Sequence, residues 1–112
     1  MQRKDRIVLQ KILGVIEETA EIFSGTLLED FLKNNERKMA MTMSILRVGE
    51  LVKNLSQEFR IENSQIEWKK IAGFRDVIAH KYDIVDMESV YDTIKYNFPE
   101  LKTEIEKILE KN

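Results

Sequence analysis

Residues 36–60, ERKMAMTMSILRVGELVKNLSQEFR, decide the fold of this 112-residue chain. Apolar side chains recur there at three- and four-residue spacing, which is the period of one helix face. The stripe runs through Met41, Ile45, Val48, Val52, Leu55 and Phe59, and it is widened by Met39, Met43, Leu46 and Leu51. A helix that is apolar over so much of its circumference packs against neighbours on more than one side. The pattern therefore predicts one long central helix over residues 36–60.

Amphipathic stretches on both sides of this segment predict further helices. In chain order we expect a helix over residues 3–23, a short helix over 27–32, a polar break over 61–66, a helix from Trp68 to about His80, a connection over 81–86, a helix that Asp86 caps and a last helix from Pro99. No stretch alternates apolar and polar residues as a strand would. The sequence therefore predicts an all-α, up-and-down bundle of four major helices plus short helices, in a single domain over residues 1–112.

Two of the expected helix starts have recognisable capping residues. Asn63 or Ser64 could cap the helix that begins near Trp68, and Ser64 and Glu67 have the spacing of a capping box. Asn97 is placed to cap the last helix, with Pro99 in its first turn. We therefore expect the helical structure to break at both places.

The composition excludes several classes of protein. The chain has no Cys, which excludes disulfide scaffolds, thiolate zinc sites and cysteine nucleophiles. No apolar run approaches the roughly 18 residues that span a bilayer, and the first residues, MQRKDRIVLQKIL, do not resemble a signal peptide. We therefore expect a cytoplasmic domain without a membrane segment. A chain of this length buries only about two-thirds of its unfolded surface, so a partner subunit would add to its core.

The formal net charge of -2 conceals a basic segment around the single histidine. Residues 68–82 have a net charge of +3, from Lys69, Lys70, Arg75 and Lys81 against Asp76. A local positive field can attract a nucleic-acid backbone although the whole chain is acidic, so the three lysines are candidate contacts of an RNA backbone. The alternative is an ordinary solvated helix face, and charge alone favours that interpretation.

Arg75 and His80 are the residues of this segment best suited to chemistry. Arginine is a permanent planar cation that matches phosphate oxygens, and histidine exchanges protons near neutral pH. Together they could cleave RNA without a metal: one group moves protons at the 2′-hydroxyl or the 5′-oxygen, and the cation stabilises the phosphorane. The two residues are five apart, which is roughly 140° of rotation on a helix, so they do not face each other squarely. The alternative is a structural histidine, because this spacing is common by chance.

The run RDVIAHKY, residues 75–82, resembles the Arg-x4-His-x-Tyr signature of HepT-like toxins in the HEPN superfamily. Residues 43–59 resemble the long central helix of that family, including its Gly-Glu pair at Gly49 and Glu50. Residues 66–74, IEWKKIAGF, resemble the family's Pro-Trp-x-x-Ile-x-Gly-Phe lead-in. The resemblance therefore covers about half of the chain.

The chain departs from the family pattern at two positions. Asp76 stands where Asn is common, and Glu67 stands where Pro is common. Asp76 could orient Arg75 or His80 by a hydrogen bond. Its negative charge beside a phosphate site would also weaken the attraction for RNA.

The resemblance implies a metal-independent endoribonuclease that is the toxin of a type II toxin–antitoxin pair and needs no cofactor. It assigns catalysis to Arg75 and His80. Family members are homodimers in which two such motifs face each other across a cleft. The family's antitoxin is a minimal nucleotidyltransferase, which binds the toxin and adenylylates a tyrosine. By motif match this tyrosine is Tyr82, which is either modified or in contact with the substrate. An added AMP beside His80 would place bulk and negative charge where an RNA phosphate should sit.

Arg47 and Glu50 interrupt the apolar central helix at a spacing of three residues. They could pair with each other, as a partly buried ion pair or in a solvated notch. Alternatively, they line the dimer cleft as orienting residues around the catalytic pair. Gly49 is expected to permit the close approach of another helix, and Trp68 and Phe74 are expected in the core or at a dimer contact.

A second hypothesis is a non-catalytic interaction module. In this case the dimer binds a nucleotidyltransferase, and the basic segment recognises the partner's nucleotide or its acidic surface. Asp76 and the net acidity of the chain favour this alternative. The sequence contains no glycine-rich phosphate loop and no carboxylate cluster with metal spacing, so we expect no bound metal under either hypothesis.

Overall fold

The computed structural model describes residues 1–111, and within that range all regular structure is helical. The elements, in chain order, are α1 (Arg3–Phe23), α2 (Leu28–Leu32), α3 (Asn35–Lys53), α4 (Gln57–Glu62), α5 (Trp68–Lys81), η1 (Tyr82–Ile84), α6 (Met87–Asp92), η2 (Thr93–Asn97) and α7 (Phe98–Lys111). Here η1 is a short 3-10 helix and η2 is a single π-helical turn. The predicted all-α class is confirmed.

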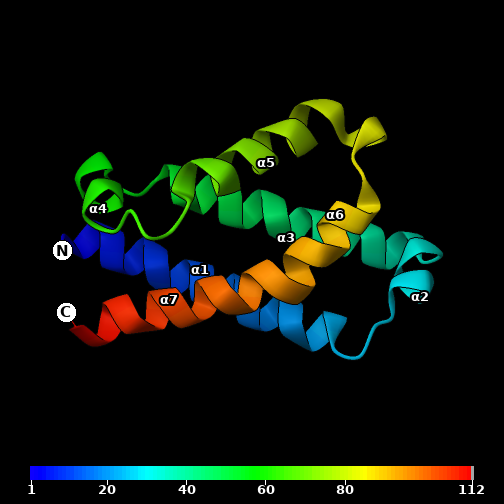
Figure 1. Ribbon diagram of the computed structural model, residues 1–112, viewed down its shortest axis with the longest axis horizontal. Helices are drawn as coiled ribbons and strands as arrows, with labels where there is room; N and C mark the ends of the chain where they lie inside the picture. Colours follow the sequence, from blue (N-terminus) through cyan, green and yellow to red (C-terminus); the bar gives the residue numbers. More distant parts are fainter. Residues whose placement is uncertain (112) are drawn as a thin grey trace.

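Four major helical segments run alternately up and down, with α3 in the middle (Figure 1). Both α1 and α5 pack against α3, and α7 packs against α1. The fourth segment consists of α6, η2 and α7 together, and it returns the chain so that both termini lie at the same end of the bundle (Figure 1). The central position predicted for the long apolar helix is therefore confirmed.

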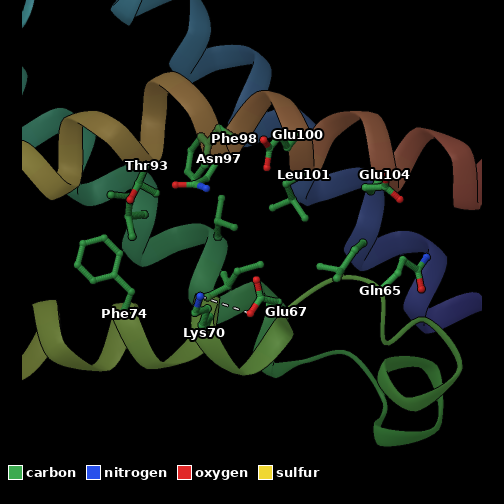
Figure 2. A pocket seen from close by; sticks show the side chains of 14 residues that line it. Gln65, Glu67, Lys70, Phe74, Thr93, Asn97, Phe98, Glu100, Leu101 and Glu104 are labelled. Atoms are coloured by element: carbon green, nitrogen blue, oxygen red, sulfur yellow. Dashed lines mark ion pairs between the residues drawn. The ribbon is translucent and has the colours of Figure 1, made fainter.

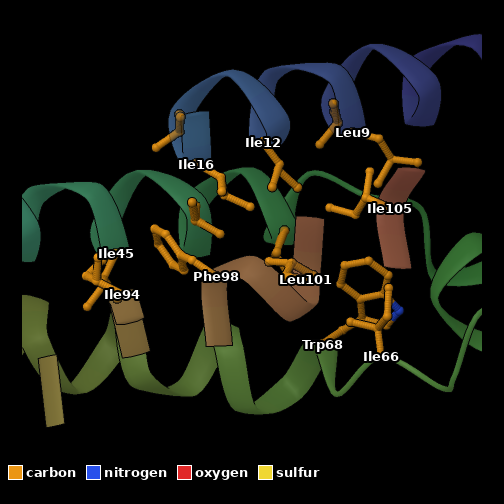
Figure 3. Packing of buried hydrophobic residues seen from close by; sticks show 14 of the residues in the cluster. Leu9, Ile12, Ile16, Ile45, Ile66, Trp68, Ile94, Phe98, Leu101 and Ile105 are labelled. Carbon is orange, nitrogen blue, oxygen red and sulfur yellow. The ribbon is translucent and has the colours of Figure 1, made fainter. Parts of the chain in front are cut away.

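One hydrophobic core joins these segments, and Figure 3 shows its packing between α1, α3 and α7. Leu9 and Ile12 of α1 and Ile105 of α7 are completely buried. Trp68 is also buried, and its ring centroid lies 5.8 Å from that of Phe59 in α4. The expected place of Trp68 in the core is therefore confirmed.

The prediction of one helix over residues 36–60 is wrong, because α3 ends at Lys53 and α4 begins after Ser56. The Ser56 hydroxyl accepts a hydrogen bond from the Phe59 backbone N–H at 3.1 Å, which is N-cap geometry. Asp5 of α1 is 1% exposed and accepts hydrogen bonds from the Ser56 N–H at 2.8 Å and the Ser56 hydroxyl at 2.7 Å. The buried carboxylate thus fixes a helix start at a point where the apolar pattern continues without interruption.

The expected capping box at the start of α5 is also wrong. Glu67 occupies the N-cap position, but its side chain makes no capping hydrogen bond and pairs instead with Lys70 at 3.4 Å. In the connection between α4 and α5, Asn63 rather than Ser64 makes the stabilising contact: its carbonyl accepts a hydrogen bond from the Trp68 indole at 3.0 Å. The buried indole therefore helps to set where α5 begins.

The boundary expected at Asn97 does not exist, because the helical path continues from α6 through η2 into α7. Pro99 has no N–H to donate, and its ring would crowd the carbonyl four residues earlier in an α-helix. The π turn directly before it widens the helix, with the Phe98 N–H donating to the Thr93 carbonyl five residues back. The predicted cap at Asp86 is confirmed, since its carboxylate accepts a backbone N–H at 3.0 Å.

Candidate functional site

The basic segment lies on α5, which packs along α3 (Figure 1). Gly49 of α3 permits the close approach of the two helices. A Cβ built at this glycine would lie 2.7 Å from Cγ of Arg75 and 3.4 Å from the carbonyl oxygen of Ile71. The expected role of Gly49 in helix approach is therefore confirmed, and the position directly opposite belongs to Arg75.

The guanidinium of Arg75 lies between two carboxylates. Its Nη2 is 2.9 Å from Oε2 of Glu50 on α3, and its Nη1 is 3.2 Å from Oδ1 of Asp76 on α5. The side chain is 26% exposed. Its buried Nε has no hydrogen-bond partner within the described chain. Arg75 is thus a partly exposed cation, held against α3 by charge pairing.

Asp76 has a second cationic partner, Lys53 of α3, whose ammonium contacts the same Oδ1 atom that Arg75 contacts. The hydrogen bond from Lys53, and secondarily the one from Arg75, holds the pKa of Asp76 below its ordinary value of 3.8. Within the described chain Asp76 therefore contacts Arg75 and not His80. Sequence reasoning missed Lys53, because its contact with Asp76 depends on how α3 packs against α5.

His80 and Tyr82 lie at the C-terminal end of α5 and the start of η1, and both are exposed, Tyr82 by 43%. Neither side chain has a hydrogen-bond or ion-pair partner among residues 1–111. Because α5 is helical from Arg75 to His80, the two side chains leave it roughly 140° apart. The structure therefore does not join Arg75 and His80 within one chain.

Arg47 and Glu50 do not pair with each other, so that expectation is wrong. Arg47 pairs with Glu18 of α1 at 3.5 Å, whereas Glu50 pairs with Arg75 of α5. The two residues lie three apart on α3, but each faces a different neighbouring helix. Glu50 therefore belongs to the charged cluster around Arg75, and Arg47 does not.

The three lysines of the basic segment are all exposed. Lys70 pairs with Glu67 at 3.4 Å, and both of these side chains remain mostly exposed. Lys69 and Lys81 make no ion pair within the part of the chain that the structure describes. All three are therefore accessible to a polyanion, and Lys81 directly follows His80.

A cavity of about 420 Å³ lies elsewhere on α5, between this helix and the segment formed by η2 and α7 (Figure 2). Phe74 lines it from α5, is half-buried and packs against the core, as the sequence predicted for this residue. Asn97 and Glu100 line the opposite side. Arg75 and His80 are not part of its lining, so the cavity is separate from the charged cluster.

The geometry can be compared with known families. A family described as "Ribonuclease HepT-like" matches residues 12–108. The chain belongs to the HepT-like ribonuclease family. The match includes all four major segments of the HepT-like bundle and the run from Arg75 to Tyr82. The resemblance drawn from the sequence is therefore confirmed at the level of the family.

Relatives of this HepT-like chain are described as ribonucleases. "Putative RNase TTE0752" of Caldanaerobacter subterraneus subsp. tengcongensis is 39% identical over 106 residues, which cover 95% of each chain. "Putative RNase MJ1216" of Methanocaldococcus jannaschii is 33% identical and covers 97% of this chain and 91% of its own. "Probable ribonuclease HepT" of Thermococcus cleftensis is 31% identical and covers 96% and 98% respectively. No solved structure matches the chain significantly.

Membrane-spanning helices and groups of metal-binding side chains are both absent from the described part of this HepT-like chain. Among residues 1–111, no helix combines the length and the apolar character that crossing a membrane requires. In the same range, no three His, Asp or Glu side chains are grouped so that they could hold a metal ion.

Proposed function

We propose that this chain is a metal-independent endoribonuclease and the toxin of a type II toxin–antitoxin pair, acting in the cytoplasm. The single observation that supports the proposal best is the placement of Arg75 and His80. Both residues stand on α5. The guanidinium of Arg75 is partly exposed and paired with α3, and the imidazole of His80 is exposed and has no partner in the described chain. The family assignment to HepT-like ribonucleases supports the same activity.

His80 and Arg75 divide the chemistry in the proposed reaction. The 2′-oxygen of the ribose attacks the adjacent phosphorus, and the bond from phosphorus to the 5′-oxygen breaks. His80 accepts the proton of the 2′-hydroxyl or donates a proton to the leaving 5′-oxygen. Arg75 stabilises the negative charge that develops on the phosphorane oxygens. Lys69, Lys70 and Lys81 contact the RNA backbone nearby.

A homodimer would supply the second half of the site. Arg75 and His80 diverge on one helix, so a full set of groups around one phosphate requires a second copy of α5. Large apolar side chains are exposed on the two helices that hold the site and on the turn after them; they are Met39, Met43, Val77, Tyr82 and Ile84. A homodimer interface would cover these exposed apolar side chains.

Tyr82 is the proposed point of control by a nucleotidyltransferase antitoxin. It is 43% exposed and lies two residues after His80, so its hydroxyl is available to an enzyme that transfers AMP. The added phosphodiester would place a negative charge beside the groups that bind the RNA phosphate. Arg47, which pairs with Glu18, is not part of this arrangement.

The test is cleavage of RNA by the purified wild-type chain, His80→Ala and Arg75→Ala, each with and without EDTA. We expect cleavage by the wild type under both conditions, none by His80→Ala, and an unchanged oligomeric state in all three. Equal cleavage by the wild type and His80→Ala would contradict the catalytic assignment. Loss of the wild-type activity in EDTA would contradict metal independence.

A second candidate function is a non-catalytic module that binds a nucleotidyltransferase. The observation in its favour is that Glu50 and Asp76 both pair with Arg75, which lowers the net positive charge offered to RNA. Under this alternative, the chain purifies with its partner but does not cleave RNA, and Arg75→Ala weakens the complex.

A further inference from the structure

Four charged side chains alternate in sign across the contact between α3 and α5. Glu50 and Lys53 stand one turn apart on α3, and Arg75 and Asp76 are consecutive on α5. Glu50 pairs with Arg75, Lys53 pairs with Asp76, and Arg75 also pairs with Asp76. With both cations present the four side chains are neutral together; without Lys53 they have a net charge of -1.

We propose that Lys53 is a positioning residue for RNA cleavage. Lys53 pairs with Asp76, and this pairing leaves the guanidinium of Arg75 available to an RNA phosphate. This inference rests on the function proposed above, and it assigns a role to a residue outside the Arg-x4-His-x-Tyr run.

The geometry of the shared oxygen supports this role. Lys53 and Arg75 both contact Oδ1 of Asp76, so they compete for the same acceptor atom. Without Lys53, Arg75 would be the only cationic partner of this carboxylate among residues 1–111, and the two would pair more strongly. A phosphate that approaches the guanidinium competes with the carboxylates already paired to it, so stronger pairing weakens RNA binding.

The charge balance acts in the same direction. A phosphate backbone approaching Arg75 also meets the charges of Glu50 and Asp76, both of which are partly exposed. Lys53 offsets one of these negative charges at short range. Its side chain is 36% exposed and that of Asp76 is 45% exposed, so solvent and salt screen the effect. The expected change is therefore several-fold rather than complete.

The test compares the cleavage rates of Lys53→Met, Asp76→Asn and the double variant at low salt. We expect Lys53→Met to cleave RNA about fivefold more slowly than the wild type. Asp76→Asn should cleave faster, and the double variant should match Asp76→Asn, because Lys53 has no carboxylate left to hold. The matched control is Lys107→Met, which removes a lysine paired with Glu104 at 3.4 Å on α7 and should leave the rate unchanged.

The double variant separates this role from two others. If Lys53 contacts RNA directly, or only fastens α3 to α5, the double variant stays as slow as Lys53→Met, and the inference is overturned. RNA affinity measured in a His80→Ala background gives a second readout, in which the same pattern is expected. Cleavage that depends on His80 but not on Lys53 overturns this inference alone. A wild-type chain that neither binds nor cleaves RNA overturns the inference together with the proposed function.

Discussion

Gly49 of α3 lies directly under the side-chain stem of Arg75, so closely that a Cβ on the glycine would lie 2.7 Å from Cγ of the arginine and nearer still to its Cβ. The Cβ of Arg75 cannot move without the backbone of α5. Gly49→Ala therefore forces the two helices apart. We expect a loss of about 1–3 kcal/mol in unfolding free energy and a drop in RNA cleavage of at least about tenfold. Denaturant unfolding and a cleavage assay measure the two effects.

Gly73→Ala is the matched control for that substitution. Gly73 is exposed on α5, and a Cβ built there meets nothing within 4 Å. An alanine at this helical position should stabilise the chain by about 0.5–1 kcal/mol and leave cleavage unchanged. If Gly49→Ala also stabilised the chain and kept full activity, the tight packing under Arg75 would have no functional role.

The parts of the site that follow from local sequence were predictable. Arg75, Asp76, His80 and Tyr82 lie within one short run, so a single helix determines their relative positions. Lys53 could not be found in this way, because its contact with Asp76 depends on the register between α3 and α5. Gly49 permits the close approach of the two helices, and only the three-dimensional packing shows which side chains meet across it.

The parts of the fold that depend on the spacing of apolar residues were predictable. The period gave the bundle and its central helix, but it did not show the end of α3 at Lys53. That end depends on Ser56 and on Asp5, which is 51 residues away in the sequence. In the same way, Pro99 indicated a helix start, whereas a π turn at Thr93–Asn97 accommodates it within a continuous helical segment.

Asp5 and Ser56 should therefore be coupled in stability. Asp5→Ala leaves the Ser56 N–H and hydroxyl without their buried acceptor, so we expect a loss of about 1–3 kcal/mol in unfolding free energy. Ser56→Ala should cost about 1 kcal/mol through loss of the N-cap. The double variant should cost less than the sum, since the two residues share their hydrogen bonds. Additive losses in denaturant unfolding would show that the contact does not stabilise the chain.

Tyr91 should contribute to stability through its hydroxyl. The side chain is buried, its hydroxyl donates to the Thr26 carbonyl at 2.8 Å, and its ring centroid lies 5.1 Å from that of Phe23. Tyr91→Phe keeps the ring but leaves the carbonyl without this donor, so we expect a loss of about 1–2 kcal/mol. Tyr96→Phe is the control: Tyr96 is exposed, and its substitution should change the unfolding free energy by less than about 0.5 kcal/mol. Equal effects of the two substitutions would contradict the role of this hydrogen bond.

The ion pairs of Asp76 should make part of the stability depend on pH. Lys53, and secondarily Arg75, lowers the pKa of Asp76 from its ordinary value of 3.8 in the folded chain. The folded state therefore binds this proton less readily than the unfolded state does. The resulting stabilisation is fully present above 3.8 and disappears as the pH falls through the lower, folded pKa. Asp76→Asn lacks the carboxylate, so wild type and variant should differ in unfolding free energy near neutral pH and converge in the acidic range below 3.8. Denaturant unfolding of both proteins across this range measures the difference, and a difference that grows on acidification would contradict the pairing.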